Sequence, residues 1–163
     1  MVCKEREALV EKLGVFLENK EQLAPVAARI MAYIILKGNA GTTFEDLVTN
    51  LCASKSTIST HLNYLADLKR LNYFTKSGDR KKYYLINRES VVQNIDKMVG
   101  MWHEELDLHK EIKAYKEKAN KHLPIEEQFD MAFHDIFMVY LKDVINSVAV
   151  LRDKIINNHL KKQ

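Results

Sequence analysis

The predicted fold is decided by residues 42–86, TTFEDLVTNLCASKSTISTHLNYLADLKRLNYFTKSGDRKKYYLI. Thr42 and Glu45 have the spacing of a capping box, which predicts a short helix starting there. Residues 52–53 predict a tight corner, and Ser54 is suited to cap a second helix. Two short helices joined by a tight corner form the pattern of a helix-turn-helix.

The hydrophobic period changes after this second helix, which we expect to end near Leu71. Residues 72–76 and 82–86 are rich in aromatic and β-branched side chains, and residues 77–80 have turn composition. This pattern predicts a β-hairpin, and residues 41–43 could add a short third strand. The order of helix, corner, helix and hairpin predicts a winged helix-turn-helix.

Long helices are predicted on both sides of this region, because the chain has only 5 Gly and 2 Pro, against about 11 and about 8 for average usage. Apolar spacing predicts a first helix over 4–19. A second helix is predicted between Pro25 and Gly38, and because it is apolar almost all round it is expected to form the core. Two more helices are predicted over 89–121 and 126–160. The apolar residues that recur at helical spacing in the first helix are Ala8, Leu9, Leu13, Phe16 and Leu17.

Positive charge gathers in the middle of the chain. The segment from Lys55 to Lys82 carries seven Lys or Arg and two Asp, a net charge of +5, whereas the whole chain carries +3. A basic segment between mildly acidic flanks is typical of a local anion-binding face. Two cysteines, a charged N-terminus and short apolar runs argue against a disulfide framework, a signal peptide and a membrane span. We therefore expect a soluble cytoplasmic protein.

The outward face of the helix after Ser54 indicates DNA binding. Its inward residues are expected to be Ile58, Leu62, Leu65 and Leu68. A merely solvated helix would favour Glu and Lys, whereas this one presents small polar side chains in its N-terminal half, where a recognition helix contacts bases and phosphates. The predicted DNA contacts here are Ser54, Lys55, Ser56, Thr57, Ser59, Thr60 and Asn63.

The predicted hairpin extends this surface. Its basic residues and one residue at the start of the helix-turn-helix complete the predicted DNA contacts: Thr43, Lys76, Arg80, Lys81 and Lys82. Arg80 could enter an adjacent minor groove, where a narrow groove attracts arginine. Asp79 is expected to hold the turn or to pair with a base, since an acid facing phosphate is unfavourable. Lysines that merely protect a strand edge are the alternative.

These residues together resemble the GbsR branch of the MarR-type transcriptional regulators. The similarity covers about residues 8–120, is strongest over 25–84, and lies in PVAARIMAY (25–33), TFEDL (43–47), ASKSTIS (53–59) and GDRKKYY (78–84). The resemblance implies a homodimeric winged-helix repressor or activator that binds a near-palindromic operator. It also implies a bacterial-type regulator whose dimer forms through helices outside the winged domain.

Dimerisation is also expected from the apolar stripes of the long helices, which one small winged domain cannot bury. The stripe of the last helix is Phe129, Phe133, Ile136, Phe137, Tyr140, Val144, Val148, Leu151 and Ile155. A monomeric helical bundle is the alternative. We predict a mainly α fold with a small β-hairpin wing: residues 1–24 as an N-terminal helix in the dimerisation region, 25–87 as the winged helix-turn-helix DNA-binding domain, and 88–163 as two long C-terminal helices for dimerisation and possible effector binding.

Three further groups of residues could form sites of other kinds. Met98, Trp102, Phe133 and Phe137 could line an effector pocket, since aromatic cages bind quaternary ammonium groups and choline sensing is known in the resembled family, but a stripe at helical spacing is more often core. His103, Asp107 and His109, with Glu104 and Glu105, invite a metal interpretation, yet no tight pair of histidines occurs, and we predict no metal and no cofactor. Cys52 suits a small buried apolar residue better than a redox switch.

The sequence thus predicts a regulator that binds double-stranded DNA as a homodimer, with the recognition helix in the major groove and the basic wing at the adjacent minor groove. A winged-helix scaffold for protein interactions, with only non-specific DNA affinity, is the alternative. An enzyme is not expected, because the chain has no Gly-rich phosphate loop, no recognisable pair of catalytic carboxylates and no nucleophile motif.

Overall fold

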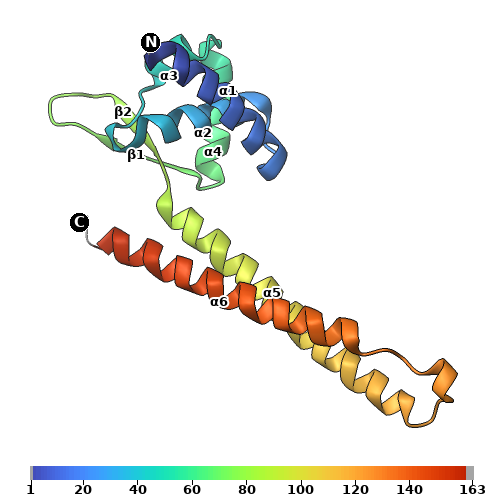
Figure 1. Cartoon of the computed structure of the whole chain (residues 1–163). Helices are drawn as coiled ribbons and strands as arrows, with labels where there is room; N and C mark the ends of the chain where they lie inside the picture. The colour runs from blue at the N-terminus through green and yellow to red at the C-terminus, as the bar shows by residue number, and fades with distance from the viewer. Residues whose placement is uncertain (1, 161–163) are drawn as a thin grey trace. The chain divides into compact units, whose positions relative to one another are not determined.

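A computed structural model of the protein describes residues 2–160, with side-chain exposure given for residues 4–158. The chain divides into two compact units, Met1–Ser90 and Val91–Gln163. Elements of the first unit (Figure 1) are α1 (Val2–Glu21), α2 (Pro25–Lys37), the 3-10 turn η1 (Gly38–Ala40), α3 (Phe44–Asn50), α4 (Lys55–Asp67), β1 (Leu71–Thr75) and β2 (Lys82–Ile86). Most of α5 (Arg88–Asn120), the 3-10 turn η2 (Ile125–Glu127) and α6 (Ala132–Leu160) form the second. The described chain is mainly helical with one two-stranded antiparallel hairpin, as predicted.

Helix α2 is the centre of the first unit, as its sequence predicted. It starts at Pro25 and ends at Gly38, which adopts a left-handed φ of 60° and donates its backbone N–H to the carbonyls of Ile34 and Ile35. Helix α2 packs against α1, α4 and β2. Its buried residues are Ala27, Ala28, Ile30, Met31, Ala32, Tyr33 and Ile34, so this helix joins the other elements into one core.

The buried face of α1 follows only part of the apolar spacing in its sequence. Val10, Gly14 and Leu17 are buried, whereas Leu9 and Phe16 are exposed. The cause is a close helix–helix contact, because a Cβ on Gly14 would lie 2.9 Å from Arg29 Cγ. The spacing of these three buried residues places them on one helical face, and Gly14 lets that face approach α2.

The sequence predicts that residues 1–24 form part of a dimerisation region, and the structure places α1 in the first unit against α2. Arg29 strengthens this contact with ion pairs to Glu11 (2.9 Å) and Glu18 (3.5 Å). A contribution of α1 to dimerisation stays a prediction.

The capping box of α3 lies one residue later than predicted. Thr43 Oγ1 accepts from the Asp46 backbone N–H (3.1 Å), and Asp46 Oδ2 accepts from the Thr43 N–H (3.2 Å). Thr42 instead exchanges two backbone hydrogen bonds with Tyr84, of 3.1 and 2.8 Å. This single bridge is the predicted third-strand contact, and it keeps Thr42 out of the helix.

Helix α4 ends at Asp67 and not near Leu71. Lys69 adopts a left-handed φ of 54°, and the Arg70 N–H donates to the Leu65 carbonyl (2.9 Å). A left-handed residue commonly ends a helix in this way, and the position is usually occupied by glycine. As a result Leu68, predicted on the inward face, is exposed.

The hairpin pairs Leu71–Thr75 with Lys82–Ile86 in antiparallel register. Phe74 faces Tyr83 across the strands, with stacked rings 5.3 Å apart. The first strand begins and ends one residue earlier than predicted, so Lys76 belongs to the connecting loop, residues 76–81.

The second unit is a helical hairpin of α5 and α6. Its buried cluster is Leu106, Leu141 and Ile145, with Val99, Trp102, Phe137 and Met138 packed against it. Helix α6 starts at Ala132 and not at residue 126, because the preceding chain is held in a loop. The Asn120 side chain accepts from the Phe129 N–H (2.8 Å) and donates to its carbonyl (2.9 Å).

Candidate nucleic-acid interface

The exposed face of α4 is built from small polar residues, while Ile58, Leu62 and Leu65 are buried on the opposite side. Its exposed predicted contacts are Lys55, Ser56, Ser59, Thr60 and Asn63. These positions recur at intervals of three and four residues, so they share one side of the helix. Their hydroxyl, amide and ammonium groups can meet base edges and phosphate oxygens.

Ser54 has a structural role at the start of α4, as predicted. Its hydroxyl accepts from the Thr57 N–H (3.1 Å) and lies 2.8–2.9 Å from the hydroxyls of Thr57 and Ser56. An N-cap of this kind stabilises a helix by about 1 kcal/mol. The same network fixes the hydroxyls at the helix end where recognition residues are expected.

Thr43 differs from the other predicted contacts. Its side chain is 7% exposed and serves the capping box with Asp46. The hydroxyl is therefore engaged in holding α3, and the candidate interface does not include Thr43.

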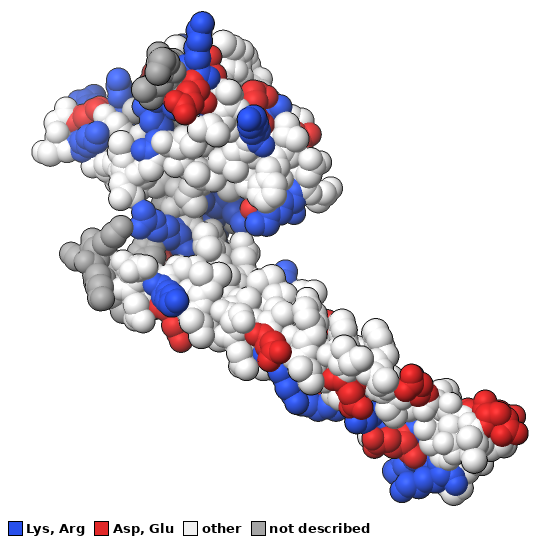
Figure 2. All heavy atoms as spheres, viewed as in Figure 1, with Lys and Arg blue, Asp and Glu red and all other residues white. Residues whose placement is uncertain are grey.

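The hairpin loop and the first residue of β2, Lys82, carry the basic part of the candidate interface. Lys76, Arg80, Lys81 and Lys82 are all exposed. Two of the ammonium groups lie over rings: Lys76 is 4.0 Å from the centre of Tyr83, and Lys82 is 4.2 Å from that of Tyr73. Figure 2 shows Lys and Arg side chains gathered at the protruding loop between β1 and β2, which makes it a suitable surface for an anion.

Asp79 holds this loop, which was one of the two roles expected for it. Its carboxylate accepts from the Tyr83 hydroxyl (2.7 Å) and from the Lys81 backbone N–H (2.9 Å). The hydrogen bond from Tyr83, followed by that from Lys81, lowers the pKa of Asp79. Asp79 therefore stays ionised while both carboxylate oxygens are occupied within the loop.

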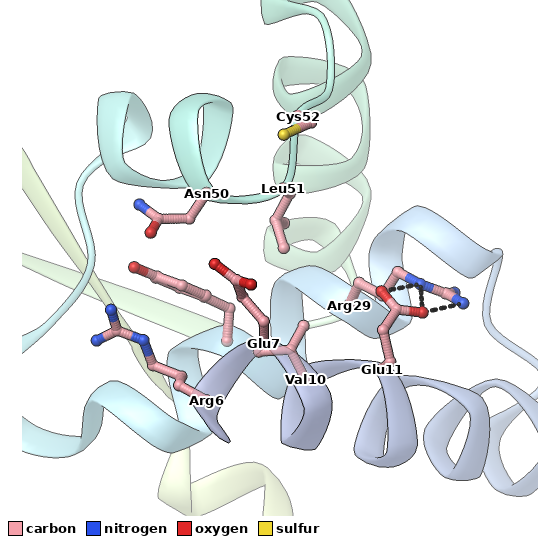
Figure 3. Close-up of a pocket in the computed structure, with 9 residues that line it drawn as sticks. Arg6, Glu7, Val10, Glu11, Arg29, Asn50, Leu51 and Cys52 are labelled. Carbon is pink, nitrogen blue, oxygen red and sulfur yellow. Dashed lines mark hydrogen bonds and ion pairs between the residues drawn. The ribbon is translucent and has the colours of Figure 1, made fainter. Parts of the chain in front are cut away.

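A cavity of about 240 Å³ lies between α1, α2 and the corner after α3 (Figure 3). Charged, polar and apolar side chains line it, among them Arg29, which is paired with Glu11. Cys52 lies at its edge, and this thiol is exposed, contrary to the expected buried position. The corner places Cys52 at a left-handed φ of 49° on the surface of the turn.

The four predicted effector-pocket residues are only partly brought together. Trp102 and Phe137 pack against the buried cluster of α5 and α6. Met98 and Phe133 are exposed, and the Phe133 ring stacks on Phe137 at 5.5 Å. The effector pocket stays a prediction.

A histidine pair in the second unit was missed by the sequence reasoning. His134 is 5% exposed, its Nδ1 lies 2.9 Å from His109 Nδ1, and its Nε2 lies 3.0 Å from Lys116 Nζ. An ammonium group can only donate, so Nε2 of His134 accepts and its Nδ1–H points to His109. A spacing of 25 residues gave no local signal for this pair.

The metal interpretation finds no further support in the structure. Asp107, which was considered as a ligand, is paired with Lys110 at 2.7 Å. Among the described residues, no group of three or more His, Cys, Asp or Glu side chains is arranged to hold a metal ion.

The histidine pair predicts a pH-dependent stability. Burial, followed by the nearby charges of Lys116 and His109, lowers the pKa of His134, whereas Asp135 acts in the opposite direction. The unfolded chain takes up this proton near pH 6.5, before the folded chain does. Stability is therefore fully present above pH 6.5 and falls as the pH drops below it.

Thermal unfolding followed by circular dichroism between pH 8 and 5 measures this dependence. We expect His134→Gln to flatten the acid-side fall in melting temperature, whereas the exposed His122→Gln control keeps it. Equal pH dependence in both variants would show that His134 is not responsible.

The arrangement of α2, α3, α4 and the β1–β2 hairpin defines a winged helix-turn-helix protein. A crystal structure of a transcriptional regulator is similar over 91% of this chain and 99% of that one, with a TM-score of 0.51 and 19% identity. A mutant of S. aureus MepR covers 91% of this chain and 93% of its own, with a TM-score of 0.42 and 15% identity. No family model and no curated protein sequence matches the chain. The similarity to the crystal structure of the transcriptional regulator shows that the two chains share a fold.

None of the helices within residues 2–160 combines the length and the apolar character that crossing a membrane requires.

Proposed function

We propose that this protein is a transcriptional regulator, without catalytic activity, that binds specific sequences of double-stranded DNA as a homodimer. The observation that carries the proposal is the exposed face of α4, where small polar side chains fill the N-terminal half of the helix. The exposed cations of the hairpin loop give the same unit a second surface for phosphate. In this proposal α4 occupies the major groove and the wing reaches the adjacent minor groove.

The proposed dimer rests on the apolar side chains that α6 leaves uncovered. Phe133, Ile136, Tyr140 and Leu151 are all at least half exposed, with Ile136 at 71%. They share one side of α6, away from the buried Leu141 and Ile145. Monomeric proteins seldom expose a contiguous apolar patch of this kind, so we propose that a second copy of the chain covers it.

Within this proposal, the resemblance noted in the sequence assigns the protein to the GbsR branch of the MarR-type regulators. A C2 dimer would set its two α4 helices about 34 Å apart, one turn of DNA, and would prefer a near-palindromic operator. A small-molecule effector at the C-terminal helices belongs to the same proposal, and its chemistry is left open.

Fluorescence anisotropy with labelled duplexes at increasing salt tests DNA binding. Each subunit offers five exposed cations at the candidate interface, Lys55, Lys76, Arg80, Lys81 and Lys82. We expect the logarithm of the association constant to fall with the logarithm of salt at a slope of about −5 to −9 for the dimer. DNA binding that occurs only at very low salt, without a preferred sequence, would favour the protein-interaction scaffold instead.

A further inference from the structure

The loop between β1 and β2 places an acid directly before the arginine that is proposed to meet DNA. An ionised Asp79 with free oxygens would repel phosphate and could draw the Arg80 guanidinium onto itself. In the structure Asp79 instead directs both carboxylate oxygens at the hairpin, to the Tyr83 hydroxyl (2.7 Å) and the Lys81 N–H (2.9 Å). Arg80 is exposed and makes no side-chain hydrogen bond or ion pair with any described residue.

Backbone geometry brings Asp79 to this position. Gly78 adopts a left-handed φ of 77°, and the Asp79 N–H donates to the Lys76 carbonyl (3.0 Å). This closes a tight turn at the tip, a conformation that glycine adopts without steric cost. The turn points the carboxylate back along β2, where Tyr83 lies four residues later.

Tyr83 is itself held from several sides, so its hydroxyl is a fixed donor. Its ring stacks on Phe74 at 5.3 Å with an angle of 23° between the planes, and the Lys76 ammonium lies 4.0 Å from the ring centre. Gly41 lies against the base of this side chain, because a Cβ there would lie 2.9 Å from Tyr83 Cβ. A hydroxyl on a clamped ring can hold a loop residue with little further loss of entropy on binding.

Both partners keep the protonation states that the hydrogen bond needs. The hydrogen bond to Asp79 raises the pKa of the Tyr83 phenol, and the bond from Tyr83 lowers the pKa of the Asp79 carboxyl. The phenol therefore stays a donor and the carboxylate an acceptor throughout the neutral range.

We infer that Tyr83 is a positioning residue for DNA binding: its hydroxyl holds the Asp79 carboxylate against the hairpin so that the wing presents Arg80 to the DNA without a competing acid. This inference rests on the proposed function, because Arg80 must contact DNA for its presentation to matter. Tyr83 acts through Arg80 and is not assigned a contact with DNA of its own.

A double-mutant cycle between Tyr83→Phe and Arg80→Ala tests this assignment. Tyr83→Phe keeps the ring, its stacking on Phe74 and its contact with Lys76, and removes only the hydroxyl. We expect it to weaken binding of a preferred duplex by about threefold to tenfold in the parent. In the Arg80→Ala background the same change should have almost no effect, since the residue it positions is gone.

Tyr73→Phe is the matched control. Tyr73 lies on the neighbouring strand under Lys82, and its hydroxyl has no hydrogen bond to any described residue. We expect this variant to bind DNA as the parent does. An NMR titration of the free protein supplies a readout without DNA: the pKa of Asp79 should move back towards its ordinary value in Tyr83→Phe and stay in place in Tyr73→Phe.

The outcomes separate the two claims. If the parent binds a preferred duplex and Tyr83→Phe binds it with the same affinity, the role of Tyr83 is overturned and the proposed function remains. If Tyr83→Phe lowers the affinity for DNA equally in the parent and in the Arg80→Ala background, its effect is a general structural one, and the role of Tyr83 is again overturned. A parent without affinity for any duplex overturns both. An unchanged Asp79 pKa in Tyr83→Phe contradicts the hydrogen bond on which the inference depends.

Discussion

Replacing Arg80 with alanine is expected to weaken binding to every DNA sequence by about 2–4 kcal/mol, because a dimer loses two minor-groove arginines at once. The side chain is exposed and has no partner among the described residues, so folding should not change. The salt dependence should also become shallower, by about one unit of slope for each lost phosphate contact. Anisotropy titrations at several salt concentrations measure both quantities.

Two comparisons make this result specific. Lys121→Ala removes an exposed cation at the end of α5, outside the candidate interface, and should leave affinity unchanged. Asn63→Ala and Thr57→Ala, on α4, should instead relax the preference at particular base pairs by about 1–3 kcal/mol. Parent-like binding by Arg80→Ala would remove the wing from the interface.

Replacing Ile136 with aspartate is expected to convert the dimer into monomers of 18.9 kDa. Ile136 is 71% exposed in the single chain, so the change should not disturb the fold of α6. In a dimer it would bury an unpaired carboxylate, which is strongly unfavourable. Light scattering after gel filtration measures the mass, with about twice that of one chain expected for the parent.

Ala149→Asp is the matched control, because it adds the same charge at an exposed position on the opposite side of α6. It should remain dimeric.

Monomeric Ile136→Asp should also lose about 100-fold or more in affinity for an operator with two half-sites, since binding to one half-site no longer brings a second subunit to the other. A parent that elutes as a monomer at micromolar concentration contradicts the proposed dimer.

The elements with strong local signals could be predicted from the sequence. Pro25 and Gly38 fix both ends of α2, and Ser54 fixes the start of α4, because each residue acts on the backbone beside it. The hairpin was also predictable, since the two aromatic strands flank a turn with Gly78 at a positive φ. In each case the physical cause lies within a few residues.

The misplaced boundaries have causes that residue type and local spacing do not reveal. Thr42 with Glu45 and Thr43 with Asp46 have the same capping-box spacing, and only the bridge of Thr42 to Tyr84 selects the second pair. The end of α4 depends on Lys69, which adopts a left-handed conformation without being glycine. Neither choice is visible in a local pattern.

The same reasoning applies to the candidate site. The polar residues of α4 could be named from the sequence, because exposure follows from helical spacing. The hydrogen bond between Asp79 and Tyr83 could not, since it depends on the turn geometry of the loop. The pairing of His109 with His134 needed the packing of α5 on α6, which joins residues distant in sequence.

Selection of bound duplexes from a random DNA pool is the most direct test of the central claim, that a dimer of this chain recognises a specific operator through α4. The account predicts an enriched inverted repeat whose half-sites are about one helical turn apart, centre to centre. A selection that enriches no sequence, or one that enriches a single half-site without a repeat, would contradict it.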